Sequence, residues 1–276
     1  MQPGPGTQLE EEAHQFFINE EYPSALASYE QIIRSHEGDV TLIPDSVYRN
    51  AGLSAFYLDQ TGIALNYLNN IRHSEIANAE TQYALAILNR QIDNLSREIT
   101  ALESYVESFP EGEHIEKMRE RLFETYAKSK NYDKALPLWS EIEDSARKDE
   151  SLLNNYFNIL KELEKEEDEL YTVANELLTL NPDNTDALFF LASHYFYQAE
   201  NRYQSEMEAY EKNRTHRQYA QLLKAFEVVN ADFRKSLNYF LHLYSIDPQR
   251  RYARFIGNIY LRFEDREKAR YYHSKP

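Results

Sequence analysis

The stretch that decides the fold is LFETYAKSKNYDKALPLWSEI, residues 122–142. Its first part places apolar residues about one helical turn apart, at Leu122 and Tyr126, and a polar turn follows. Its second part repeats that spacing from Ala135 to Trp139. Because both parts have an apolar face and the connection is short, the stretch predicts two antiparallel helices packed as a hairpin.

Similar stretches recur along the chain at intervals of about 34 residues. Two of the clearest lie at residues 48–71 and 256–269. A repeat of this length indicates a stacked array, in which each unit buries its apolar face only against its neighbours. We therefore predict an all-α solenoid of about seven helical hairpins.

A short disordered tail at residues 1–6 is expected to precede the solenoid, which covers residues 7–276. In the third hairpin Glu98 stands where a small residue is expected. In the sixth, residues 200–231 lengthen both helices by about 16 residues, or roughly 24 Å. The predicted units are about 7–37, 46–73, 78–110, 114–147, 151–184, 186–248 and 250–273.

Recurring turn and helix residues resemble those of the tetratricopeptide repeat family. A turn followed by tyrosine occurs at Glu21-Tyr22 and Asn131-Tyr132. The family's alanine near the start of the second helix and its closing proline are matched by Ala25, Ala64, Ala135, Ala269, Pro110, Pro182 and Pro248. The resemblance implies a right-handed superhelix whose concave groove, lined by the first helix of each pair, binds peptides or proteins. The long sixth hairpin is similar to that of uncharacterised bacterial members, which provide no activity to transfer.

Composition excludes several classes of function. The chain has 276 residues and no cysteine, so it has no disulfide, thiol nucleophile or cysteine metal site. A formal net charge of −16 argues against binding to nucleic acid or anionic lipid. No apolar run approaches the ~20 residues that span a bilayer. We expect a soluble protein without membrane insertion, and the sequence leaves open whether it is cytoplasmic or exported with its leader missing here.

The charge is unevenly distributed along the chain. Residues 1–200 contain 15 Lys and Arg against 37 Asp and Glu, a net of −22, whereas residues 201–276 contain 15 against 9, a net of +6. An acidic solvated surface with an ordinary basic end accounts for this. The functional alternative is that the basic end binds an acidic partner, or the acidic body of another copy in a homo-oligomer.

Motifs for catalysis or cofactor binding are missing from the sequence. The eight histidines are scattered, and there is no HExxH, phosphate-binding glycine loop or GxSxG. The acidic run at residues 162–169 is interpreted as a solvated turn. We therefore predict a non-enzymatic protein with no cofactor or metal. An enzyme or small-ligand protein with a pocket under the long hairpin is kept as an alternative.

The candidate binding residues lie on the first helices of the sixth and seventh hairpins. Helical spacing places aromatic residues on the expected groove face of one helix and a row of arginines on that of the other. An aromatic wall beside arginines suits a peptide with acidic and apolar side chains. In the alternative interpretation the aromatics are core and the arginines only solubilise the end. The candidate residues are Phe189, Ser193, Phe196, Tyr197, Arg251, Arg254, Asn258 and Arg262.

The N-terminal groove lacks the residues for another kind of site. Some members of the repeat family hold a partner's C-terminal carboxylate with basic residues and asparagines on three consecutive units. The matching positions here are Glu10, His14, Asn50, Glu80 and Ala84. Two acidic residues there would repel a carboxylate, so we exclude that function. The chain is predicted to be a protein-interaction module or scaffold whose concave groove binds a segment of a protein partner.

Overall fold

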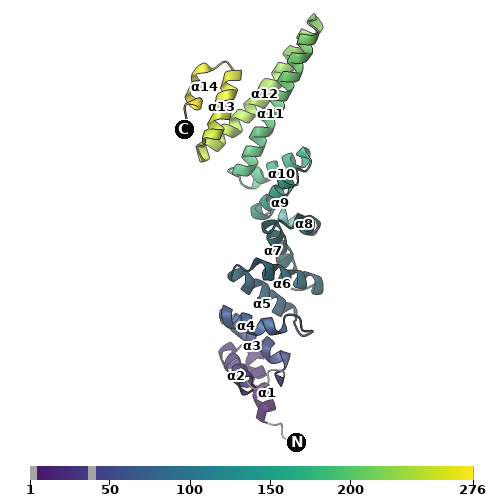
Figure 1. Ribbon diagram of the computed structural model, residues 1–276, viewed down its shortest axis with the longest axis vertical. Coiled ribbons are helices and arrows are strands. Elements are labelled where there is room, and N and C mark those ends of the chain that lie inside the picture. The colour runs from purple at the N-terminus through teal and green to yellow at the C-terminus, as the bar shows by residue number, and fades with distance from the viewer. Residues whose placement is uncertain (1–4, 37–41, 276) are drawn as a thin grey trace. The chain divides into compact units, whose positions relative to one another are not determined.

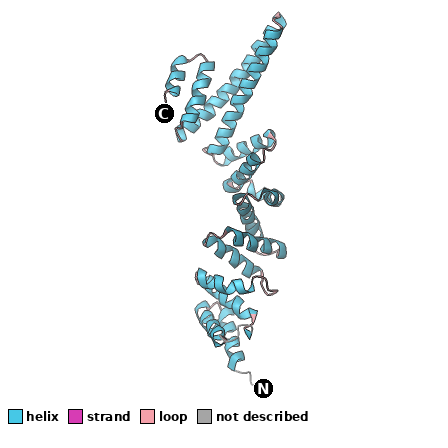
Figure 2. Cartoon of the chain, viewed as in Figure 1, coloured by secondary structure: helices cyan, strands magenta, loops and turns pink. Residues whose placement is uncertain are grey.

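The computed structural model describes residues 5–36 and 42–275, and their regular structure consists of α-helices without a strand (Figure 2). Helices that follow each other along the chain pair as antiparallel hairpins (Figure 1). Residues 1–4 of the predicted tail lie outside the described part, and the first helix begins at Pro5. The all-α prediction, with a lengthened sixth hairpin, is confirmed.

The helices fall into two compact units, residues 1–143 and 144–276. The first unit contains α1 (Pro5–Ile18), α2 (Tyr22–Ser35), α3 (Asp45–Tyr57), α4 (Thr61–Ile71), α5 (Ala79–Gln91), α6 (Leu95–Ser108), α7 (Ile115–Lys128) and most of α8 (Tyr132–Ala146). The second contains α9 (Glu150–Glu162), α10 (Glu167–Leu180), α11 (Thr185–Lys212), α12 (His216–Ile246), α13 (Arg250–Arg262) and α14 (Arg266–His273).

Small residues let the helices of the first unit approach closely. A β-carbon added to Gly52 on α3 would lie 2.5 Å from the Cδ2 atom of Leu68 on α4. Ala64, which is fully buried, stands one turn before Leu68. The third hairpin uses a different solution, because Glu98 is 2% exposed and its Oε1 accepts a hydrogen bond of 2.6 Å from Arg121 Nε on α7. The carboxylate is therefore buried as an ion pair between neighbouring hairpins.

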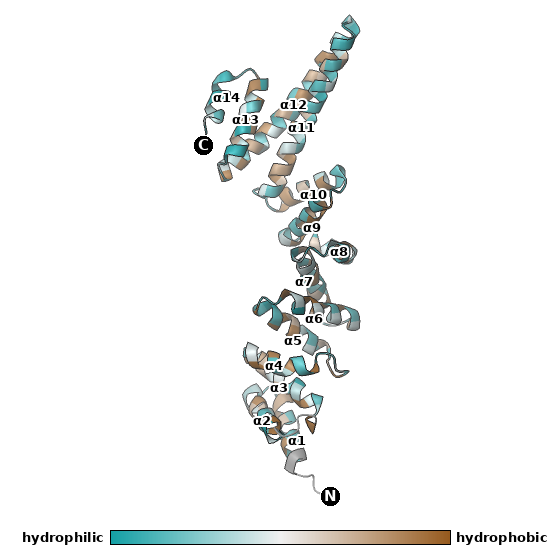
Figure 3. Ribbon diagram, in the orientation of Figure 1, coloured by the Kyte–Doolittle hydropathy of each residue, from teal (hydrophilic) through white to brown (hydrophobic). Residues whose placement is uncertain are grey.

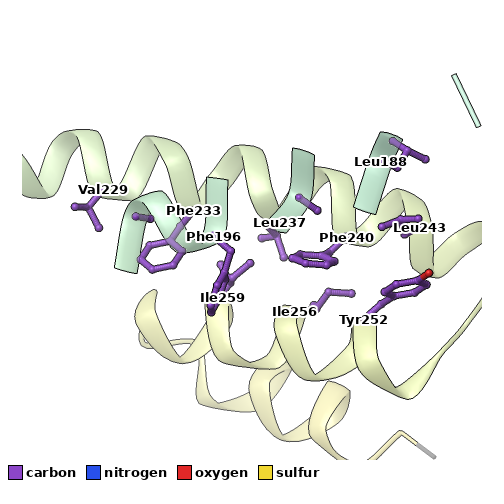
Figure 4. Packing of buried hydrophobic residues seen from close by; sticks show 12 residues of the cluster. Leu188, Phe196, Val229, Phe233, Leu237, Phe240, Leu243, Tyr252, Ile256 and Ile259 are labelled. Carbon is purple, nitrogen blue, oxygen red and sulfur yellow. The ribbon is translucent and has the colours of Figure 1, made fainter. Parts of the chain in front are cut away.

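The second unit is dominated by the α11–α12 hairpin, whose helices have 28 and 31 residues. Its base packs on α13 through a cluster of buried apolar side chains from all three helices, including Phe233 and Phe240 of α12 and Ile256 of α13 (Figure 4). Towards the far end, aromatic pairs join the two helices: the rings of Tyr203 and Phe226 stack at 5.4 Å. That end extends beyond α13 and α14 (Figure 1).

The α13–α14 hairpin has a polar outer surface. Its last helix carries one buried apolar residue, Ala269, among exposed Arg266, Lys268 and Arg270. In Figure 3 α14 is coloured mostly teal, as expected of hydrophilic residues. Exposed charged side chains of this kind suit a helix face that contacts water.

Candidate functional site

The structure brings α11 and α13 together along the faces that the sequence analysis singled out. The rings of Phe196 on α11 and Phe255 on α13 are 4.9 Å apart, and those of Phe189 and Tyr252 are 5.8 Å apart. Both helices also pack on α12, which fixes their positions relative to each other. We call the surface formed by Phe189, Tyr197, Arg251, Arg254, Phe255 and Asn258 the α11–α13 face.

The aromatic residues of α11 differ in what they can offer a ligand. Phe196 is only 7% exposed and lies among the buried side chains between α12 and α13 (Figure 4). Phe196 is part of the core, so its predicted place on the groove surface is corrected. Its ring packs against the rings of Tyr197 and Phe255, which form part of the α11–α13 face. Tyr197 is 55% exposed, and its ring packs edge-on against Phe196 and Phe255. Phe189 is half-buried.

Two arginines of α13 are open to solvent on the face. The Arg251 guanidinium lies over the rings of Phe189 and Tyr252, 4.8 Å and 4.6 Å from their centroids, and donates a hydrogen bond of 2.5 Å to the Tyr252 hydroxyl. Arg254 has no hydrogen-bond or ion-pair partner within residues 5–36 and 42–275. Stacking on aromatic rings holds a guanidinium in place while its outer edge stays free for an anion.

Arg262 is already engaged with another side chain. Its Nε donates to Glu200 Oε1 at 3.0 Å, its Nη2 donates to Glu200 Oε2 at 2.5 Å, and its guanidinium lies 4.6 Å from the centroid of Tyr203. This bidentate pair ties α13 to α11. The expectation that Arg262 binds a partner's acidic group is therefore not supported by its contacts.

The two remaining predicted residues are Asn258 and Ser193. Asn258 is exposed and its Oδ1 atom lies 3.1 Å from His273 Nε2 on α14. Ser193 Oγ is buried without a hydrogen-bond partner among the described residues.

The sequence analysis missed one residue of the face. Phe255 lines an open pocket of about 220 Å³ together with Arg251, Arg254 and Asn258. Phe255 lies about one helical turn after Arg251 and one turn before Asn258. This spacing places it on the same helix face and could have identified it. The pocket thus combines two guanidinium groups, an amide and an aromatic ring.

The described part of the chain does not contain three clustered metal-ligating side chains. The hydroxyl groups of Tyr171 on α10 and Tyr195 on α11 lie 2.7 Å apart. Burial and this hydrogen bond raise the pKa of Tyr195, which opposes formation of a phenolate base.

Among the described residues, none of the helices combines the length and the apolar character needed to cross a bilayer.

Comparisons with known proteins give similarity at the level of fold. Neither a scan against family models nor a search of curated proteins yields a match. Among solved structures, a Bacteroides ovatus protein described as a proposed protein-binding protein is 20% identical, and the match covers 80% of this chain and 98% of that one with a TM-score of 0.52.

Two further solved structures match with lower TM-scores. A tetratricopeptide repeat protein from Parabacteroides merdae is 14% identical, covering 97% of this chain and 90% of that one with a TM-score of 0.42. MamA of strain AMB-1 is 18% identical, covering 68% and 90% with a TM-score of 0.44. With its ordered helical hairpins and the Bacteroides ovatus match, the chain has the fold of an α-helical solenoid built of antiparallel hairpins.

Proposed function

We propose that this chain is a non-enzymatic protein-interaction module and that its α11–α13 face binds an acidic segment of a protein partner. The observation that carries the proposal is the pair of solvent-facing arginines, Arg251 and Arg254, beside the exposed ring of Tyr197 and the pocket at Phe255. Carboxylates of the partner would pair with the guanidinium groups, and an apolar side chain would pack on the rings.

The charge around the face supports an acidic ligand. From Arg250 to Phe263 the chain contains four arginines and no acidic residue. Glu200 of α11 forms an ion pair with Arg262 of α13, which neutralises its charge. A field of one sign attracts an oppositely charged ligand and raises its rate of association, and this effect weakens as salt is added.

Peptide binding tests the proposal directly. A fluorescent peptide that alternates glutamate with phenylalanine should bind the full chain, and a matched peptide with lysine in place of glutamate should not. Arg251→Glu with Arg254→Glu should weaken binding by about tenfold or more, because two charge-assisted contacts become repulsive. The matched control is Arg266→Glu, an exposed arginine of α14 outside the face.

Retained binding by the double variant, with unchanged helical circular dichroism, would remove these arginines from the site. The alternative function is self-association between the acidic body and the basic end. It predicts dimers at low salt that dissociate near physiological salt, where the Debye length is about 8 Å. Sedimentation velocity at the two salt concentrations separates a dimer from a monomer that binds peptide.

A further inference from the structure

A separate pocket lies within the first unit, remote in sequence from the α11–α13 face. It has a volume of about 140 Å³ and is formed by the C-terminal end of α4 with the residues that follow it, one side of α5 and one side of α6. Leu85 and Ala101 provide apolar lining, and Asn89 provides a buried polar group. The pocket is therefore a built site on three helices, with both polar and apolar walls.

The ionisable side chains that line this pocket are all basic. They are Arg72, His73 and Arg97, and the lining contains no carboxylate. A lining without acidic residues is unexpected here, because residues 1–200 contain 37 Asp and Glu against 15 Lys and Arg. Among the described residues neither arginine forms an ion pair, and the one side-chain hydrogen bond of Arg72 runs from its Nε to His73 Nε2 at 3.0 Å. Both guanidinium groups thus keep their terminal amino groups available for an anion.

Asn89 adds an unsatisfied hydrogen-bond acceptor. Its side chain is held in place because Nδ2 donates to the Leu85 carbonyl oxygen at 2.7 Å. The residue is 2% exposed, and its Oδ1 atom is buried without a hydrogen-bond partner among the described residues. Leaving a buried acceptor unpaired costs free energy, which a ligand hydroxyl that reaches Oδ1 would recover.

Size and chemistry together define the ligand. A cavity of about 150 Å³ accommodates a molecule the size of benzene, so this pocket suits roughly six to ten non-hydrogen atoms. The arginines can pair with a carboxylate or phosphate group, and Asn89 can accept a hydrogen bond from a hydroxyl group. The apolar lining can pack against a short carbon chain. We propose that the α4–α6 pocket binds a small hydroxylated organic anion, either a hydroxy acid or a phosphomonoester.

Isothermal titration of the full chain with four probes tests each part of the proposal. L-malate represents hydroxy acids, and succinate is the same dicarboxylate without the hydroxyl group. Glycerol 3-phosphate represents phosphomonoesters, and glycerol is its uncharged counterpart. Saturable binding of malate or of glycerol 3-phosphate, about tenfold tighter than that of succinate or glycerol respectively, is the expected result. Which of the two binds identifies the anionic group.

Variants then locate the site. Arg97→Gln should weaken binding of the better probe by about tenfold, because one charge-assisted contact is lost. Arg90→Gln is the matched control, since Arg90 is exposed on α5 and does not line the pocket. The Arg251→Glu and Arg254→Glu double variant should bind the probe normally, which separates this site from the proposed peptide face.

Three results would overturn the proposal. The first is no saturable binding of any probe up to concentrations on the order of 10 mM. The second is equal affinity for the probes with and without the hydroxyl group, which would remove the role of Asn89. The third is binding that Arg97→Gln leaves unchanged, which would place the anion elsewhere.

Discussion

At the residue scale, Gly52 shows how little space separates paired helices. A β-carbon at this position would meet Leu68 at Cδ2 and, at 3.2 Å, at its backbone nitrogen. Leu68 is fully buried in a packed interior and has no room to move aside. At Gly257, by contrast, an added β-carbon would meet the side chain of His273, which is exposed and can rotate away.

These two glycines give a matched prediction. Gly52→Ala should lower the free energy of unfolding by about 1–2 kcal/mol, because the overpacking cost exceeds the gain of ~1 kcal/mol in helix propensity. Gly257→Ala should change it by less than about 1 kcal/mol. Urea denaturation followed by circular dichroism measures both. Equal effects would show that the α3–α4 contact is not tighter than the α13–α14 contact.

The ion pair between Glu98 and Arg121 is asymmetric in burial. The carboxylate side chain is 3% exposed, whereas the guanidinium is 22% exposed and also pairs with Glu124 at 2.8 Å. Removing the arginine leaves a buried carboxylate without its partner. Removing the carboxylate leaves an arginine that keeps Glu124 and access to water.

Arg121→Ala should therefore destabilise the chain by about 3 kcal/mol, and Glu98→Ala by less than about 1 kcal/mol. An alanine at position 98 would also match Ala25, Ala64, Ala135 and Ala269, which occupy the corresponding position of four other hairpins. The Glu98→Ala and Arg121→Ala double variant should recover most of the stability lost in Arg121→Ala. Additive losses in this double-mutant cycle would contradict a direct pairing.

At the element scale, a repeated feature is the conformation of the tight turns inside the hairpins. Six non-glycine residues have a positive φ of 50–61°, and each lies between the paired helices of one hairpin: Glu20, Asp59, Asp93, Lys130, Glu164 and Glu264. The left-handed conformation at this position ends a helix and usually favours glycine. The α11–α12 hairpin differs, because the residues with a positive φ do not include any of its turn.

Replacing such a residue by glycine should stabilise the array. We expect Glu264→Gly to raise the free energy of unfolding by about 0.5–1 kcal/mol, because the left-handed strain of a β-carbon exceeds the added flexibility of the unfolded chain. Glu267→Gly, inside α14, is the control and should lower it by about 1 kcal/mol. Thermal denaturation measures both, and destabilisation by Glu264→Gly would show that the turn is not strained.

At the scale of the whole molecule, stability is distributed along the chain. Each hairpin of a repeat array contacts mainly its neighbours, so a local change is not transmitted to the entire chain at once. The contacts of this protein also group into two compact units, residues 1–143 and 144–276.

Hydrogen exchange should show this independence. Gly52→Ala is expected to accelerate exchange in α3 to α6 and to leave the protection of α11 to α14 unchanged. Phe240→Ala, which empties part of the buried cluster of α11, α12 and α13, should have the converse effect. Acceleration of all helices by either variant would indicate one cooperative core.

The helices and hairpins were predictable from the sequence because their signals are local. A helix shows itself in the three- and four-residue spacing of apolar side chains, and each turn lies within a few residues of its helices. This is why the bounds of α11 and α12, and the long hairpin they form, could be anticipated. The place of the candidate site on α11 and α13 followed from the same spacing.

Only the tertiary structure decided which side chains of that site are available to bind a partner. Arg262 and Glu200 are 62 residues apart, and their pairing depends on how α13 stacks beside α11. The burial of Phe196 and the α4–α6 pocket around Arg72 and Arg97 likewise arise between helices. Helical periodicity gives the direction of a side chain from its own helix, but what it meets depends on neighbours distant in sequence.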